Sequence, residues 1–159
     1  SKDIRWRALS GYWLPSGAPG GLTGAAPSEK PAVAYRLLRP EEATRMVFQT
    51  DADVTALFGV AVSDWERKGY IFKTVGLRAT LIKDGEPIIE KTLTAPIVGL
   101  KRRFTIELTE DAVFVYLDDS TEPLMQYYLE RREPPVSPFA CGFAVARGVM
   151  TIDAIHFGD

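Results

Sequence analysis

Turn-forming residues divide this chain into short segments, and this punctuation is the strongest constraint on its fold. Glycine and proline supply 13 and 11 of the 159 residues. They gather in the first 31 residues and again within 131–138, and single glycines or polar turns separate most of the other segments. Both residue types end helices and bound short strands. We therefore expect short strands and loops rather than long helices.

From residue 32 onward the segments have the composition and period of β-strands. In 101–108 apolar side chains alternate with polar ones, which predicts a half-buried strand. In 54–62 the same alternation places Phe58 and Val60 on one face. The pair Asp84-Gly85 is typical of a tight hairpin turn between antiparallel strands. Further strands are expected at 32–38, 44–50, 70–75, 77–83, 113–117, 124–129, 139–145 and 149–157.

These segments predict an all-β sandwich of about ten to twelve strands. At most one or two short helical turns are expected, at 40–43 and 63–68. The length suits one domain over residues 1–159. Residues 1–31, rich in Trp, Gly and Pro, are expected to form a short terminal strand and an arm that packs on the sandwich.

Five segments of the chain carry a family resemblance. They are the Trp-rich stretch ending in Gly-Gly-Leu-Thr-Gly at 13–24, Phe-Gly-Val-Ala-Val at 58–62, Gly-Tyr-Ile-Phe at 69–72, the strand pair at 104–119 and the ending at 138–157. Together they resemble the concanavalin A-like superfamily, which includes laminin G-like modules, legume-type lectins and 3-keto-disaccharide hydrolase-like domains. The resemblance implies two antiparallel sheets in jelly-roll order. It implies no single activity, because such folds host many functions.

The composition argues against several kinds of partner and site. With 19 Lys+Arg and 21 Asp+Glu the net charge is −2, which weakens the case for nucleic acid. The basic clusters 101–103 and 131–132 are expected to be solvated sheet edges. One Cys and one His cannot build a structural zinc site or an internal disulfide. No apolar run is long enough to span a membrane.

Aromatic side chains are the best candidates for a binding site, because sugar rings stack on exposed aromatic faces while their hydroxyls need polar partners. Trp65 stands out because it lies in a charged connection at 63–69 that is expected to face water. The predicted ligand-binding residues are Trp65, Asp64, Arg67, Tyr116, Gln126 and Tyr128. For each tyrosine the alternative is packing across neighbouring strands.

A catalytic centre is the alternative to a binding site. A glycosidase of this superfamily is expected to carry alternating acids such as Glu-x-Asp-x-x-Glu, and that spacing does not occur in the chain. If the chain is an enzyme, Glu107, Asp153 and His156 would form its polar centre. Asp153 is expected to share the face of His156 and to orient its imidazole ring.

Four aspartates, Asp51, Asp53, Asp118 and Asp119, could supply oxygen ligands to Ca²⁺. Aspartate is also an ordinary turn residue whose carboxylate binds nearby backbone N–H groups. We therefore expect no cofactor, with calcium at these loops as the alternative. Cys141 lies among small and apolar residues and is expected to be a buried, inert thiol.

The sequence favours a non-catalytic module that binds a glycan or a surface polysaccharide. The chain begins without an initiator Met or a secretory apolar segment, so we expect a domain excised from a larger secreted or cell-envelope protein. One alternative is a sugar hydrolase or lyase resembling the 3-keto-disaccharide hydrolase-like domains. The other is a structural domain whose sheets pack on neighbouring domains. A cleft with convergent acids would favour the enzyme, an open aromatic groove the sugar binder, and a flat apolar face the structural domain.

Overall fold

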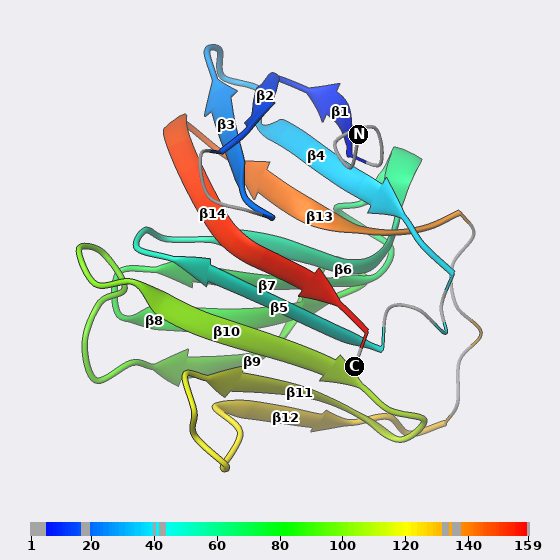
Figure 1. Cartoon of the computed structure of the whole chain (residues 1–159). Helices are drawn as coiled ribbons and strands as arrows, with labels where there is room; N and C mark the ends of the chain where they lie inside the picture. Colours follow the sequence, from blue (N-terminus) through cyan, green and yellow to red (C-terminus); the bar gives the residue numbers. More distant parts are fainter. Residues whose placement is uncertain are drawn as a thin grey trace.

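The strands pair into two antiparallel sheets that pack face to face (Figure 1). The computed structural model describes residues 6–16, 20–39, 41, 44–131, 134 and 138–158. Within these residues, seven strands form sheet A in the order β1-β4-β13-β6-β7-β8-β9. Seven form sheet B in the order β12-β11-β10-β5-β14-β3-β2. The predicted all-β, two-sheet antiparallel jelly-roll sandwich is confirmed.

The strands are short, as the spacing of the turn residues predicts. Sheet A contains β1 (Arg7–Ser10), β4 (Ala32–Leu37), β6 (Thr55–Ala61), β7 (Tyr70–Val75), β8 (Arg78–Lys83), β9 (Glu86–Thr92) and β13 (Phe139–Val145). Sheet B contains β2 (Tyr12–Pro15), β3 (Leu22–Ala26), β5 (Arg45–Thr50), β10 (Arg102–Leu108), β11 (Ala112–Leu117), β12 (Met125–Tyr128) and β14 (Gly148–Phe157).

Helical structure is confined to short turns in the part of the chain that the structure describes. The 3-10 helix η3 (Val62–Asp64) follows β6 and overlaps the start of the second helical turn expected at 63–68. The first expected turn, at 40–43, falls mainly on residues outside the described ranges, as does Arg132 of the second basic cluster. Among the described residues, no helix is long and apolar enough to cross a membrane.

The space between the sheets is filled by aromatic side chains from both of them. Phe48 on β5 stacks on Phe104 on β10 at 5.6 Å between ring centroids, and its ring meets the edge of Phe143 on β13 at 5.1 Å. Phe72 on β7 lies 5.2 Å from Phe104. Such pairs contribute about 0.5–1.5 kcal/mol beyond the burial of their area. They fix the two sheets against each other.

A β-bulge at Gly59 changes which residues of β6 face the core. Gly59 has a φ of +64°, and the pairing of β6 with β13 shifts register beside it. Phe58 therefore packs in the core between the sheets, whereas Val60 packs in a separate cluster with Leu57 on the outer face. The expectation that Phe58 and Val60 share a face is wrong, because the extra residue breaks the alternation.

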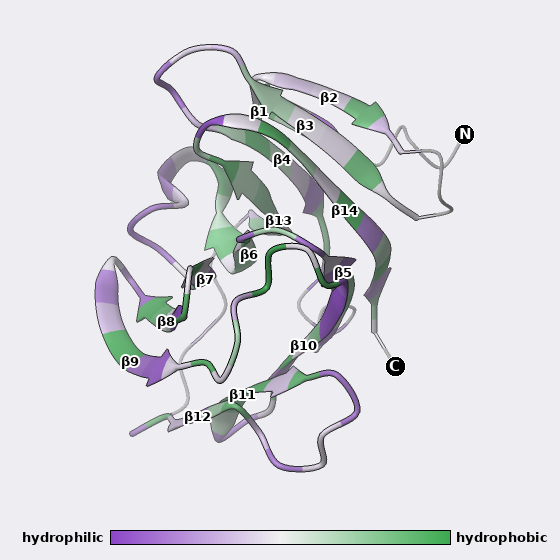
Figure 2. Cartoon of the chain, turned by 90° about the vertical axis from the view of Figure 1, so that its left-hand side faces the viewer, coloured by the Kyte–Doolittle hydropathy of each residue, from purple (hydrophilic) through white to green (hydrophobic). Residues whose placement is uncertain are grey.

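Sheet A is curved, and its outer face is the hollow one. In Figure 2 the sheet bends from β1 to β9 with its outer face inside the bend, and sheet B wraps around the inner face. The outward positions of β13 are Ala140, Gly142 and Ala144, whose small side chains leave room above the middle of the sheet. A Cβ atom added to Gly142 would lie 2.0 Å from the carbonyl oxygen of Ala34. Glycine is therefore required for the close contact of β13 with β4.

The residues before 32 contribute strands to both sheets. β1 pairs with β4 at one edge of sheet A, and β2 and β3 extend sheet B beyond β14. The indole N–H of Trp13 donates to the carbonyl oxygen of Ser10 at 3.0 Å, and its ring covers Gly24 so closely that a Cβ there would lie 2.5 Å from a ring atom. Trp6 packs against Phe143. This segment is thus built into the sheets more closely than the expected arm.

Gly69 and Gly76 both have a positive φ, but only Gly69 lacks room for a Cβ atom. Comparing alanine substitutions at the two positions therefore distinguishes the cost of the backbone conformation from the cost of a steric clash. Gly69 (φ +114°) has no room for a Cβ, which would lie 2.5 Å from the carbonyl oxygen of Gly59, while Gly76 (φ +60°) has open space. Gly76→Ala should lower the free energy of unfolding by about 1–2 kcal/mol, the cost of the left-handed conformation. Gly69→Ala should lower it clearly more. Urea unfolding of both variants gives the comparison, and equal losses would contradict the predicted clash.

The single cysteine provides a test of the core. Cys141 is fully buried on β13, and burial raises the pKa of its thiol to about 12. At mildly alkaline pH the thiol of the native protein should therefore be protonated and unreactive toward a disulfide reagent. In concentrated guanidinium chloride it should react fully. Rapid stoichiometric reaction of the native protein would contradict this burial.

Candidate functional site

The outer face of sheet A carries polar side chains in cross-strand rows on β7, β8 and β9. Phe72 and Leu81 are paired neighbours on these strands and point into the core, so the residues next to them point outward. Two outward rows follow from the register of the strands. They are Lys73-Thr80-Glu90 and Val75-Arg78-Thr92.

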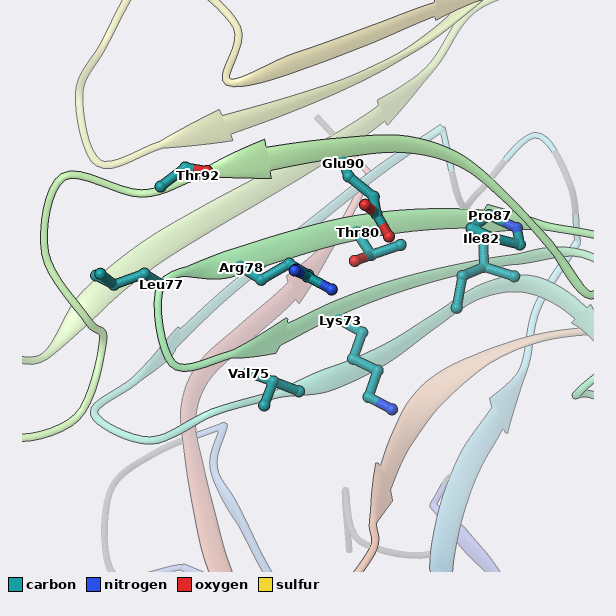
Figure 3. A pocket seen from close by; sticks show the side chains of 9 residues that line it. All are labelled: Lys73, Val75, Leu77, Arg78, Thr80, Ile82, Pro87, Glu90 and Thr92. Carbon is teal, nitrogen blue, oxygen red and sulfur yellow. The ribbon is translucent and has the colours of Figure 1, made fainter.

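These rows line a groove of about 750 Å³, which we call the main groove (Figure 3). Figure 3 shows Thr80 between Glu90 and Lys73, with Arg78 beside them. Three charged residues, Lys73, Arg78 and Glu90, line the groove, and the ion pairs found among the described residues do not include them. The rest of the lining is apolar or small: Val75, Leu77, Ile82, Pro87 and Thr92.

A second hollow of about 290 Å³, the Trp65 hollow, lies beside the main groove. Thr55, Ile71 and Ala144 line it together with Trp65. Lys73 and Ile82 line both hollows, so the two are neighbours on the same face. The Trp65 hollow adds an aromatic wall to the polar surface of the main groove.

Trp65 is positioned by an apolar cluster on the outer face of sheet A. Its side chain is partly buried against Leu57, Val60, Ile71 and Ala140, which are themselves almost fully buried. Removing this apolar surface from water favours the folded loop by roughly 25 cal/mol per Å². Trp65 therefore both covers the cluster and presents part of its ring to the Trp65 hollow.

The connection that carries Trp65 is fastened to the β8–β9 hairpin turn. Asp84 and Gly85 form that turn with φ values of 50° and 84°, which confirms the hairpin predicted from the Asp-Gly pair. The backbone N–H of Asp84 donates to the carbonyl oxygen of Gly69 at 2.9 Å. In return the N–H of Gly69 donates to the Asp84 carboxylate at 3.0 Å. The loop and the hairpin therefore form one unit.

Asp64 and Arg67 flank Trp65 in the sequence but line neither hollow. The carbonyl oxygen of Asp64 accepts the N–H groups of Arg67 and Lys68, both at 3.0 Å, and closes the turn after η3. The Arg67 side chain is 82% exposed, with Nε 3.9 Å from the Asp64 carboxylate. These two residues lie next to the hollows rather than inside them.

Tyr116, Gln126 and Tyr128 lie on the opposite side of the molecule, on the outer face of sheet B. Phe114 joins them there: its ring lies 6.2 Å from Tyr116 and 6.4 Å from Tyr128. Gln126 is the cross-strand partner of Phe114. Because the whole thickness of the sandwich separates them from Trp65, the predicted binding residues form two groups on opposite faces.

Glu107, Asp153 and His156 also face outward on sheet B, but they do not converge. The bulge at Ala154 (φ 50°) places Asp153 opposite Gln49 and His156 opposite Val47, so both share one face. β5 separates His156 from Glu107 on β10. Glu107 lies 3.6 Å from Arg45, and Asp153 accepts a hydrogen bond from Lys101 at 2.7 Å. Each acid is thus paired with a cation instead of with the other acid.

Three of the four aspartates considered for calcium bind other groups of the protein. The carboxylate of Asp53 accepts the N–H of Gly76 at 3.2 Å and holds the β7–β8 turn. The carboxylate of Asp118 accepts a hydrogen bond from Nε of Arg102 at 2.7 Å, and the carboxylate of Asp119 accepts one from the guanidinium of Arg103. Asp51 is exposed. In the ranges that the structure covers, no three His, Cys, Asp or Glu residues are grouped so as to hold a metal ion.

The basic run 101–103 is neutralised by aspartates. Lys101 pairs with Asp153, and the two arginines pair with Asp118 and Asp119. The hydrogen bond from Lys101 to Asp153 and the charge of that carboxylate raise the pKa of Lys101. The expectation that this run lies on a sheet edge is wrong, because β10 is an interior strand of sheet B. Its pairing with acids leaves no continuous basic surface for a polyanion.

Comparison with known proteins shows which fold this chain has. No protein-family model matches the chain, and no curated protein matches it in sequence. Among solved structures, carbohydrate binding module CBM66 from Bacillus subtilis superposes with a TM-score of 0.68 at 15% identity, covering 98% of this chain and 96% of that one. A putative glycosyl hydrolase from Parabacteroides distasonis gives 0.62 at 11% identity and covers 98% and 88%. The chain has a concanavalin A-like jelly-roll fold.

A third similar structure, a Bacillus licheniformis beta-glucanase, also shares the concanavalin A-like jelly roll. It superposes with a TM-score of 0.60 at 8% identity and covers 97% of this chain and 92% of that one. The likenesses extend over almost the whole chain, which is consistent with the family resemblance seen in the sequence. At these identities they establish the fold alone.

Sequence reasoning did not find four residues of the main groove, Lys73, Arg78, Thr80 and Glu90. A signal for them was present. Arg78, Thr80 and Glu90 occupy polar positions on the two strands joined by the Asp84-Gly85 turn, and Lys73 lies next to them on β7. The turn pairs Ile82 with Pro87, and a register shift after Ile82 then brings Thr80 opposite Glu90. What the sequence does not reveal is that this face of the jelly roll is the concave one.

The contact between the Trp65 loop and the hairpin turn can be tested at Asp84. Asp84→Ala removes the carboxylate that accepts the Gly69 N–H, and it places Ala at positive φ. Unfolding free energy should fall by about 1–3 kcal/mol, and amide hydrogen exchange should accelerate across 62–69. Asp84→Asn keeps an oxygen acceptor and tolerates positive φ, so it should stay close to wild type. Unchanged exchange in Asp84→Ala would show that the loop is held by other contacts.

Proposed function

We propose that this chain is a non-catalytic carbohydrate-binding module that holds its ligand on the concave face of sheet A. The observation that carries the proposal is the position of the Trp65 hollow beside the main groove. An aromatic wall and uncommitted polar side chains lie next to each other on one hollow surface. An enzyme would be expected to have a cleft with convergent acids, and a structural domain a flat apolar face. This face instead has an open groove with an aromatic side chain, the feature expected of a sugar binder.

The chemistry of the two hollows suits a sugar. The C–H faces of a sugar ring are apolar and stack on an aromatic ring such as Trp65. Its hydroxyls donate and accept hydrogen bonds, and Lys73, Thr80 and Glu90 together supply both donors and acceptors. A binding site of this kind is a concave surface with apolar side chains and a few placed polar groups.

The arrangement of acids supports binding without hydrolysis. Glycosidases use two carboxyl groups about 5–10 Å apart, one on each side of the bond that is cleaved. Among the described residues that line the main groove, Glu90 is the only acid. On the other face Glu107 and Asp153 are each paired with a cation. Asp118 and Asp119, which line a hollow there with Glu107, are also paired with arginines. The main groove itself lacks the pair of acids that a glycosidase needs.

The similar structures are consistent with a sugar ligand. One is named as a carbohydrate binding module, and two are named as a glycosyl hydrolase and a beta-glucanase. The module CBM66 matches this chain in length as well as in fold, with 96% of its own chain covered.

A glycan array with wild type and matched variants tests the proposal. Wild type should bind at least one class of printed glycan. Trp65→Leu keeps apolar contact with the underlying cluster but removes the ring, and Lys73→Met removes a charged donor from both hollows. Each should weaken binding roughly tenfold, corresponding to about 1.4 kcal/mol. Trp65→Phe should restore part of the loss.

Lys91→Met is the control for Lys73→Met. Lys91 lies on β9 opposite Ala79, whose side chain is in the core, so its position is not part of the outward rows. This variant should bind like wild type, and thermal unfolding should show that all variants are folded. Failure of wild type to bind any glycan would contradict the proposed function. Release of shorter sugars from a bound oligosaccharide would contradict the non-catalytic part of it.

A further inference from the structure

We infer that the ligand is a linear oligosaccharide that lies across the strands of sheet A, with successive sugar units in the Trp65 hollow and in the main groove at once, a placement that depends on the proposed carbohydrate-binding function. The two hollows would then be two parts of one extended site. Lys73, which lines both, would lie beneath the middle of the bound chain.

The length of the site follows from the register of the strands. One cross-strand row on the outer face runs from Ala144 on β13 through Thr55, Lys73 and Thr80 to Glu90 on β9. Five neighbouring strands are separated by four steps of about 4.8 Å, so the row is about 19 Å long. A single sugar ring covers only a fraction of this length. Several units in line are needed to contact both ends.

The two ends of the row differ in chemistry. At the β13 end most of the lining is small or apolar, and Trp65 supplies a ring for stacking. Its polar groups are the Thr55 hydroxyl, Glu66 at the loop and Lys73 at the boundary with the main groove. At the β9 end Arg78, Thr80 and Glu90 supply charged and hydroxyl groups. A single ring bound at one end would leave the groups at the other end in contact with water only. A chain across the row contacts both kinds of surface.

The direction across the strands is set by the loop at one side of the Trp65 hollow. Glu66 and the hairpin turn residue Gly85 line that hollow together with Trp65. The hydrogen bonds between Asp84 and Gly69 hold the loop and the turn in contact. The loop and the turn lie at one end of β6, β7 and β8, so a chain that follows these strands would meet them, while a chain along the row would not.

The test measures binding to gluco-, xylo-, manno- and fructo-oligosaccharides of one to six units. A glycan array identifies the sugar class, and calorimetric titration then gives the affinity for each chain length. For the sugar class that wild type binds, affinity should rise at least about tenfold from one unit to four and then level off. Glu90→Gln, at the β9 end, and Trp65→Leu, at the β13 end, should both weaken binding of the longest chains. For short chains only one of the two variants should matter.

Glu122→Gln, which changes an exposed acid in the β11–β12 connection, is the matched control and should not alter binding at any length. Equal affinity for one unit and for six would overturn the extended site while leaving the proposed carbohydrate-binding function intact. Equal weakening of short and long chains by both variants would also overturn it. Binding to no sugar of any length would remove both this inference and the proposed function.

Discussion

Burial of both faces of β13 and β6 is the constraint on which the rest of the structure depends. On the inner face, Phe143 and Phe58 join the aromatic core between the sheets. On the outer face, Ala140, Ala144 and Leu57 form a second apolar cluster. A sheet with two apolar faces needs a cover on each side, and the second cover here is the loop that carries Trp65. The aromatic wall of the candidate site thus exists because the sheet beneath it must be kept from water.

Much of the fold could be predicted because its signals are local. The Asp84-Gly85 turn makes β8 and β9 a hairpin and sets their pairing as far as Ile82, where a bulge shifts it. The alternation in β10 gives the direction of each side chain. An error arises where a β-bulge adds one residue to a strand, because every side chain beyond the bulge then points to the opposite face from the one expected. The bulge at Gly59 moves Val60 to the outer face, although the alternation predicts that it shares the face of Phe58. Asp153 and His156 share one face as expected, and the bulge at Ala154 is what places them there. A bulge needs only one residue in an unusual conformation, and nothing in a single sequence fixes its position.

The candidate site was harder to predict than the fold. Alternation shows that Trp65, Tyr116 and Tyr128 are outward or in loops, but it does not show which sheet each belongs to or how the sheets curve. The predicted residues consequently divide between two faces that are separated by the core. The basic run 101–103 shows a related difficulty, since its neutralising aspartates lie 15 or more residues away in the sequence. Faces and pairings of this kind depend on the tertiary order of the strands.

The two outer faces differ in how their charges are used. On sheet B, Arg45, Lys101 and Arg103 each lie beside a carboxylate, which lowers their ability to attract a ligand. On sheet A, the ion pairs found among the described residues do not involve Lys73, Arg78 or Glu90. A net charge of −2 hides this asymmetry completely. The charges of the concave face are therefore the ones on which the proposed function relies.

The mutual hydrogen bonds of Asp84 and Gly69 have a consequence for the energetics of binding. They join the loop that carries Trp65 to the β8–β9 hairpin turn, and both segments line the hollow. Ordering a free loop around a ligand costs roughly 0.5–1.5 kcal/mol for each immobilised side chain. Here that entropy is lost when the protein folds rather than when a ligand arrives. A surface prepared in this way can hold a weakly interacting, well-hydrated molecule that a flexible loop would release.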